Sequence, residues 1–183
     1  NKPFFENINI MNSDQNFRNC IPLSESNLEQ QVDMEFVVRF IVSRHCNFDN
    51  ISKDDNFHEF LSDRITEIAQ NPDFDIELEK QVFNDTFMYL NQLLGEDAFK
   101  KYSSEKGKFV GAVLISGFEV VALGISKNLD FIRTKANEDV KTMIQNIYER
   151  PDFKSSVAHG IRPVDRFKRL STLSLELFKN ENN

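Results

Sequence analysis

The stretch FVGAVLISGFEVVALGIS, residues 109–126, decides the fold class of this chain. It is the most hydrophobic segment of the sequence, but Glu119, Ser116 and three glycines interrupt it. A membrane-spanning helix needs about 20 apolar residues, and this interrupted run falls short of that. The segment therefore predicts a buried central helix, in which Gly111 and Gly117 let a neighbouring helix approach closely. A pair of strands is the competing interpretation, because the part FEVVALGI is prone to form β-structure.

Helical periodicity continues on both sides of this segment. Apolar residues recur at helical spacing over residues 26–45, 55–70, 76–94, 137–148 and 162–178, and a short helix is expected at 96–102. The 18 Phe, 5 Pro and 6 Gly leave few residues that punctuate the chain, which favours long helices over a turn-rich sheet protein. The sequence therefore predicts an all-α fold, an irregular bundle of about six to eight helices with a central hydrophobic helix.

The 183 residues divide into one domain and two flanking segments. The helical pattern over residues 27–179 predicts a single helical domain. Residues 1–26 are Asn-rich and weakly periodic, which predicts a loosely structured N-terminal segment with one short helix near 16–20. Residues 180–183 predict a polar tail. The chain begins with Asn1 rather than Met, which indicates a segment that was excised or processed from a longer protein.

Charge is unevenly distributed along the chain. The net charge of −7 argues against uniform adhesion to nucleic acid or to an anionic membrane. Residues 73–97 hold seven acidic residues against Lys80 alone, whereas residues 150–169 hold six basic residues against Asp152 and Asp165. If a polyanion binds this chain, the second of these regions is the expected place.

Motifs for common chemistries do not occur. The sequence contains no phosphate-binding P-loop, no dinucleotide-binding glycine pattern and no HExxH zinc motif. Adjacent His45 and Cys46, with His58, do not make a convincing metal site, so neither a metal ligand nor a catalytic residue is predicted. Cys20 and Cys46 are too few for a disulfide framework, and no signal peptide is recognisable, so the expected location is the cytoplasm.

Three charges lie inside the apolar stretch VDMEFVVRFIVSRH, residues 32–45: Asp33, Glu35 and Arg39. On a helix, Glu35 and Arg39 fall together between two apolar sectors, with the acid four residues before the base, which is the favourable order for an ion pair. Asp33 lies in the opposite gap. We expect structural ion pairing, because pairing makes buried charge tolerable. The alternative is that these residues contact another domain or a ligand, as they would if they converged on an open pocket.

The basic segment HGIRPVDRFKRLSTLSLELF, residues 159–178, is the candidate binding surface. A turn at Gly160 precedes a helix that leaves Arg162, Arg166 and Arg169 available to solvent or to a partner. These three arginines are the candidate DNA contacts, since guanidinium groups bind phosphate well. The alternative is an ordinary solvated helix face.

Three segments resemble one family, the GmrSD-type restriction endonuclease subunits. VDMEFVVRF (32–40) resembles the Arg-x-x-Asp-x-Glu-x-x-x-Arg-Phe stretch of their helical part, and GKFVGAVLISGF (107–118) is similar to their Arg-Phe-Asn-x-Ala-Leu-type helix. Residues 159–178 resemble their closing segment. Gln30 and Val110 replace the family's first Arg and its Asn. The matching positions are Asp33, Glu35, Arg39, Phe40, Phe109, Ala112 and Arg166.

The resemblance implies a function. In that family a ParB-like N-terminal domain carries an Asp-Gly-x-Gln-Arg motif associated with nucleotide-dependent chemistry, and members act against foreign, often modified, DNA. No such motif occurs here. The resemblance therefore implies a non-catalytic helical domain without a cofactor of its own, which supports a ParB-like catalytic domain of the same protein that uses nucleotide and Mg. The alternative is a stand-alone interaction module that docks a basic partner on an acidic face at residues 73–97.

Overall fold

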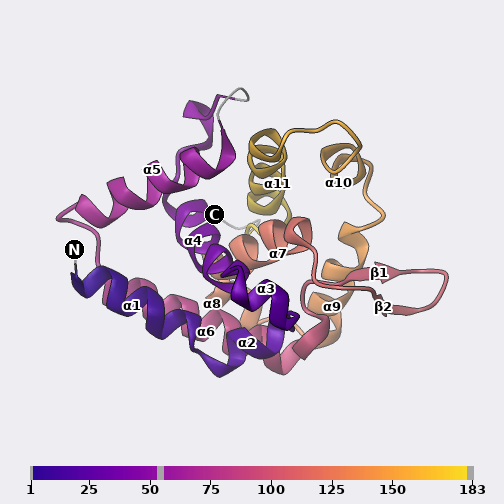
Figure 1. Cartoon of the computed structure of the whole chain (residues 1–183). Helices are drawn as coiled ribbons and strands as arrows, with labels where there is room; N and C mark the ends of the chain where they lie inside the picture. Colours follow the sequence, from indigo (N-terminus) through magenta and orange to yellow (C-terminus); the bar gives the residue numbers. More distant parts are fainter. Residues whose placement is uncertain (1, 53–55, 181–183) are drawn as a thin grey trace.

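The computed structural model, shown in Figure 1, describes residues 2–52 and 56–180. In this part of the chain the fold is all-α apart from one small antiparallel hairpin, so the predicted fold class is confirmed. There are more helices than the six to eight expected, because several are too short to show a period. The elements are α1 (Lys2–Asn12), α2 (Gln15–Cys20), α3 (Glu25–Glu29), α4 (Val32–His45), η1 (Phe48–Asn50), α5 (Phe57–Gln70), α6 (Ile76–Leu93), η2 (Gly95–Asp97), β1 (Lys101–Ser103), β2 (Lys108–Val110), α7 (Ile115–Lys127), α8 (Leu129–Arg133), α9 (Asn137–Ile147), α10 (Pro151–Ser156) and α11 (Pro163–Leu177).

Helix α7 is the predicted central helix, and all its residues from 117 to 126 are buried. Figure 1 shows it between α4 and α11. Its small residues allow this close packing: a Cβ on Gly124 would lie 2.1 Å from the Phe178 ring and 2.8 Å from the Ser174 hydroxyl. Ser174 Oγ also donates to the Val120 carbonyl at 2.5 Å. Helices α7 and α11 are therefore held nearly backbone to backbone.

The predicted boundaries of this central helix were wrong at its start. Residues 108–110 form strand β2, paired with β1 so that Phe109 lies opposite Tyr102. Gly111 follows with φ of 81°, a left-handed conformation that ends the strand and that other residues seldom adopt. The helix begins only at Ile115 and includes the part FEVVALGI, so the competing strand interpretation of that part was also wrong.

The predicted helix over residues 26–45 is two helices. Ser24 accepts a hydrogen bond from the Asn27 N–H and caps α3, which begins one residue earlier than expected. Gln31 then adopts φ of 57°, which breaks the helical path before α4. The sequence gives no warning of this break, because neither Gly nor Pro lies there.

In the predicted loose segment at residues 1–26, the short helix expected near 16–20 is present as α2, but α1, from residue 2, and the start of α3 are ordered helices that were not expected. Helix α1 buries Phe4, Ile8 and Met11 on one face, and α2 buries Phe17. The apolar residues of α1 have helical spacing, but the many asparagines between them obscure it. Of the predicted polar tail, residues 181–183 lie outside the described part of the chain.

Two groups of apolar side chains form the core. The larger group contains a cluster of phenylalanine rings from α2, α4, α6 and α7, in which Phe83 and Phe87 have centroids 4.5 Å apart. The smaller group joins α5 to α4 and α11 through Phe57, Phe60 and Phe167. Among the described residues, no helix has the length and apolar content needed to cross a bilayer. The candidate site lies where α5 meets α4, α7 and α11.

Candidate functional site

A buried carboxylate on the central helix organises the site. Glu119 is only 3% exposed. Its Oε1 accepts hydrogen bonds from Arg39 Nη1 at 2.5 Å and from Arg166 Nη2 at 3.3 Å, and its Oε2 accepts from Arg166 Nε at 3.0 Å. Arg39 also donates from Nε and Nη2 to Glu35 Oε1, at 2.9 and 2.5 Å. These four residues, the Glu119 quartet, join α4, α7 and α11 and balance two negative charges with two positive charges.

The quartet lies in a poorly solvated environment. Burial raises the pKa of Glu119, and the guanidinium groups of Arg166 and Arg39 oppose that rise. The Arg39 guanidinium carbon also lies 4.4 Å from the ring centroid of Phe57, so a cation–π contact adds to its ion pairs. Charges at this depth persist only when paired and hydrogen-bonded, and the quartet meets both conditions.

The quartet forms one wall of an open cavity of about 500 Å³. The side chain of Glu35 is 32% exposed and that of Arg166 is 22% exposed, whereas the Glu119 side chain is 1% exposed. The arginines therefore separate the Glu119 carboxylate from the cavity. The cavity is lined by Glu35, Arg39, Asn56, Phe57, His58, Ile115, Arg162, Pro163 and Arg166.

The three charges predicted in α4 divide between two places. The predicted ion pair between Glu35 and Arg39 is present, and both residues reach the cavity. Asp33 lies elsewhere: Arg18 Nη2 and Asn12 Nδ2 donate to its Oδ2 at 2.8 and 2.9 Å. Asp33 thus ties α4 to the N-terminal helices. A purely structural interpretation fits Asp33, whereas partly exposed Glu35 and buried Arg39 also line the cavity.

The three arginines predicted as DNA contacts also divide. Arg162 is exposed and lines the cavity, and Arg166 lines it while it binds Glu119. Arg169 pairs with Asp165 at 2.8 Å and lines a different cavity with Asp152. The basic segment is therefore not one uniform cationic face.

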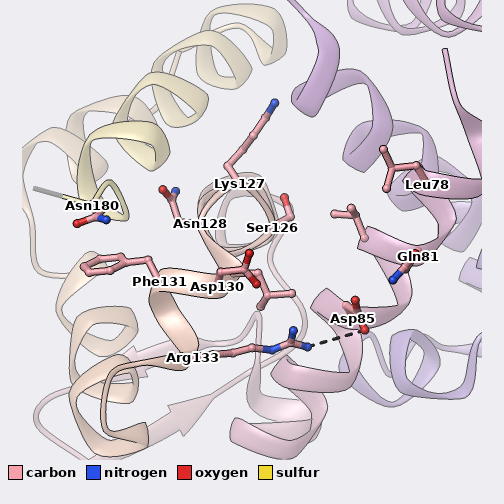
Figure 2. Close-up of a pocket in the computed structure, with 12 residues that line it drawn as sticks. Leu78, Gln81, Asp85, Ser126, Lys127, Asn128, Asp130, Phe131, Arg133 and Asn180 are labelled. Atoms are coloured by element: carbon pink, nitrogen blue, oxygen red, sulfur yellow. Dashed lines mark ion pairs between the residues drawn. The ribbon is translucent and has the colours of Figure 1, made fainter. Parts of the chain in front are cut away.

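The acidic stretch 73–97 does not form one face either. Glu79 is 3% exposed and points inward, where Arg44 Nε and His45 Nε2 lie 2.7 and 2.9 Å from its carboxylate. Figure 2 shows Asp85 in a separate cavity, where it faces Arg133 at 3.8 Å. In the described part of the chain, the proposed acidic docking face is interrupted.

Sequence reasoning missed the central residue of the site. Glu119 was noted only as an interruption of an apolar run, although a carboxylate in such a run needs a cationic partner. Phe57, under the Arg39 guanidinium, looked like an ordinary core residue. The signal for Glu119 was present, but the sequence does not say which arginines reach it.

The cysteines show no sign of nucleophilic activation. Burial raises the pKa of Cys20 to about 12 and also raises that of Cys46. Both side chains are therefore protonated thiols at neutral pH. Within residues 2–52 and 56–180, no three His, Cys, Asp or Glu side chains are grouped so that they could hold a metal ion.

No family model, curated protein or solved structure matches this chain. The resemblance to GmrSD-type subunits therefore stays a hypothesis that rests on three short segments of sequence. The geometry of the Glu119 quartet and its cavity is the independent guide to function.

Proposed function

We propose that this chain is a non-catalytic helical domain that contacts a DNA phosphate at the cavity beside the Glu119 quartet. It would support a ParB-like catalytic domain in a GmrSD-like, nucleotide-dependent cytoplasmic protein that acts on foreign or modified DNA. One observation carries the proposal. Glu35 and Arg39, predicted as a structural ion pair or an interdomain contact, and Arg162 and Arg166, predicted as DNA contacts, line the same cavity.

In the quartet, Glu119 holds the Arg166 guanidinium in a fixed orientation that suits phosphate binding. Arg166 uses Nε and Nη2 to hold Glu119, and its Nη1 donates to no acceptor in the described part of the chain. A guanidinium fixed by a buried carboxylate loses little freedom when an anion binds, which favours affinity. Phe57 and Ile115 line the same cavity and offer apolar surface to a sugar or a base.

The acids of the quartet support a binding role rather than proton transfer. Glu35 and Glu119 accept all the hydrogen bonds that join the quartet, and guanidinium groups engage both oxygens of Glu119 and Oε1 of Glu35. Such carboxylates orient arginines and are poor general bases. In this proposal the nucleotide and Mg bind to the ParB-like domain.

The test is binding of a fluorescently labelled DNA duplex, followed by anisotropy over a range of salt concentrations. We expect affinity at low salt that falls steeply as salt rises, and Arg162→Ala should reduce the slope of log K against log salt by about 1. Lys154→Ala is the matched control, because Lys154 belongs to the basic region 150–169 but pairs with Glu149 outside the cavity. Absence of binding at low salt, or equal behaviour of the two variants, would contradict the proposal.

A further inference from the structure

A different cavity, of about 540 Å³, lies where helices α4, α7 and α11 end. Three cationic side chains line it, Arg44 from α4, Lys127 from α7 and Lys179 just after α11. It shares no lining residue with the cavity of the Glu119 quartet. Its cations raise the question of which anion they face.

Arg44 is the buried member of this group, with its side chain 10% exposed. Its Nε and Nη2 donate to the Glu79 carboxylate at 2.7 and 3.4 Å, so one edge of the guanidinium is occupied. Its Nη1 is buried and has no acceptor within the described residues. Buried donors nearly always have a partner, and the side chain that carries this unpartnered donor lines the cavity.

Within the described part of the chain, the two lysines also lack an acidic partner. Figure 2 shows the Lys127 side chain extending away from Asp130 and Arg133. Neither Lys127 nor Lys179 forms an ion pair with a described residue. Burial lowers the pKa of Lys127, the positive charge of Arg44 lowers it further, and Glu79 opposes both. Two neighbouring cations that repel each other are stabilised by an anion between them.

The side-chain amide of Asn47 adds a neutral hydrogen-bond donor to the three cations that line the cavity. The Asn47 side-chain oxygen accepts the Asp49 N–H at 3.0 Å, which leaves the amide nitrogen of Asn47 available at the same cavity. Two exposed acids, Asp49 and Glu176, also line the cavity and can accept hydrogen bonds from hydroxyl groups. The lining thus combines donors for an oxyanion with acceptors for a polyhydroxylated group.

We propose that this cavity binds a small phosphorylated sugar, whose phosphate lies among Arg44, Lys127 and Lys179 and whose hydroxyl groups face Asp49 and Glu176. The cavity volume falls within the range of small-molecule sites. Charge-assisted hydrogen bonds from several cations are the usual way in which proteins hold phosphate. The site is independent of the proposed DNA contact, and either proposal can fail without the other.

A structural explanation competes with this one. Three helices end at the cavity, and the carbonyl ends of helices carry partial negative charge that nearby cations offset. In that case Lys127 and Lys179 stabilise the fold to the same extent with or without phosphate. A ligand site instead requires saturable binding that depends on these lysines.

Isothermal titration calorimetry with ribose 5-phosphate, with inorganic phosphate and with ribose separates the two explanations, at ionic strength held constant with sodium chloride. We expect saturable binding of ribose 5-phosphate, weaker binding of inorganic phosphate and none of ribose. Lys127→Ala and Lys179→Ala should each weaken binding roughly tenfold or more, whereas Lys154→Ala, which lies outside the cavity, should not. Circular dichroism confirms that each variant is folded, and Lys179, which is exposed, provides a variant that tolerates substitution if Lys127→Ala does not fold.

The proposal is overturned if ribose 5-phosphate shows no saturable binding at about 10 mM, which is far above the affinity of a specific site. It is also overturned if both lysine variants bind as the unsubstituted protein does. Equal binding of ribose 5-phosphate and inorganic phosphate would retain the anion site and remove the sugar from it.

Discussion

Two buried glutamates of this protein have similar exposure, but their pKa values are shifted in opposite directions. Glu119 and Glu79 are each 3% exposed, and each is held by two basic side chains. Burial raises the pKa of Glu119 in spite of its two arginines. Burial also acts on Glu79, but hydrogen bonds and charge from His45 and Arg44 outweigh it, and the pKa of Glu79 is lowered.

The surroundings of the two carboxylates explain the difference. Burial is the largest cause of the raised pKa of Glu119, and the negative charge of Glu35 adds to it, since Arg39 is shared between the two carboxylates. Glu79 has no second acid in its group, and His45 beside it is one-third exposed to water. The protonation of a buried acid thus depends on depth and on like charges nearby, not only on how many cations hold it.

The largest expected effect is at Glu119. Glu119→Ala leaves Arg39 and Arg166 buried without their shared acceptor, so the free energy of unfolding should fall by about 3–5 kcal/mol. Urea denaturation measures it. Glu138→Ala is the control, because Glu138 is an exposed acid whose ion pair with Lys141 lies on the surface, and little change is expected there. A loss no greater than the control's would mean that the quartet does not hold α4, α7 and α11 together.

The next effect is at Glu79. Glu79→Ala should reduce the free energy of unfolding by about 2–4 kcal/mol, since Arg44 loses its acceptor but exposed His45 can become neutral and hydrated. The same urea experiment measures it, with Gln81→Ala on the exposed face of α6 as control. A larger loss of stability in Glu79→Ala than in Glu119→Ala would mean that the buried pair of arginines around Glu119 contributes less than we infer.

The sequence predicts the local part of both groups and not the long-range part. The Glu35–Arg39 pair follows from four-residue spacing on one helix, and α6 was placed within one residue because its caps and period are clear. Glu119 meets Arg39 and Arg166, which lie 80 and 47 residues away in the chain. Local spacing says nothing about which helices become neighbours, so the centre of the site could not be predicted.

Other errors have local causes. The break at Gln31 depends on a left-handed conformation that glutamine seldom adopts. The hairpin between β1 and β2 has three-residue strands, too short for an alternating pattern to be recognised. In both cases the local sequence carried too weak a signal for the feature to be predicted.

A third prediction asks whether the quartet depends on the close contact of α7 and α11. In Gly124→Ala the new Cβ would meet Phe178 and Ser174, so α11 must shift and the Arg166 guanidinium must move relative to Glu119. We expect the free energy of unfolding to fall by about 1–3 kcal/mol. Urea denaturation of Gly124→Ala, Glu119→Ala and the combined variant measures the coupling. Strict additivity would show that helix contact and ion pairing are independent.

The dependence of stability on pH is the smallest expected effect, and it tests the comparison between Glu79 and Glu119 most directly. The folded-state pKa of Glu79 lies below its ordinary 4.5, so its contribution is present above that pH and is lost as pH falls through the folded pKa. The folded-state pKa of Glu119 lies above 4.5, so its contribution decreases as pH rises from 4.5 through the folded pKa. Each slope is at most about 1.4 kcal/mol per pH unit, the value for one proton.

Glutamine variants isolate the two contributions, because they keep the shape of the side chain and remove its titration. The stability advantage of the unsubstituted protein over Glu79→Gln should shrink as pH falls below the ordinary glutamate pKa. Its advantage over Glu119→Gln should shrink as pH rises above that value. Urea denaturation at a series of pH values gives both curves. Curves that slope in the same direction would mean that the two carboxylates titrate alike, which would contradict the opposite pKa shifts inferred from their surroundings.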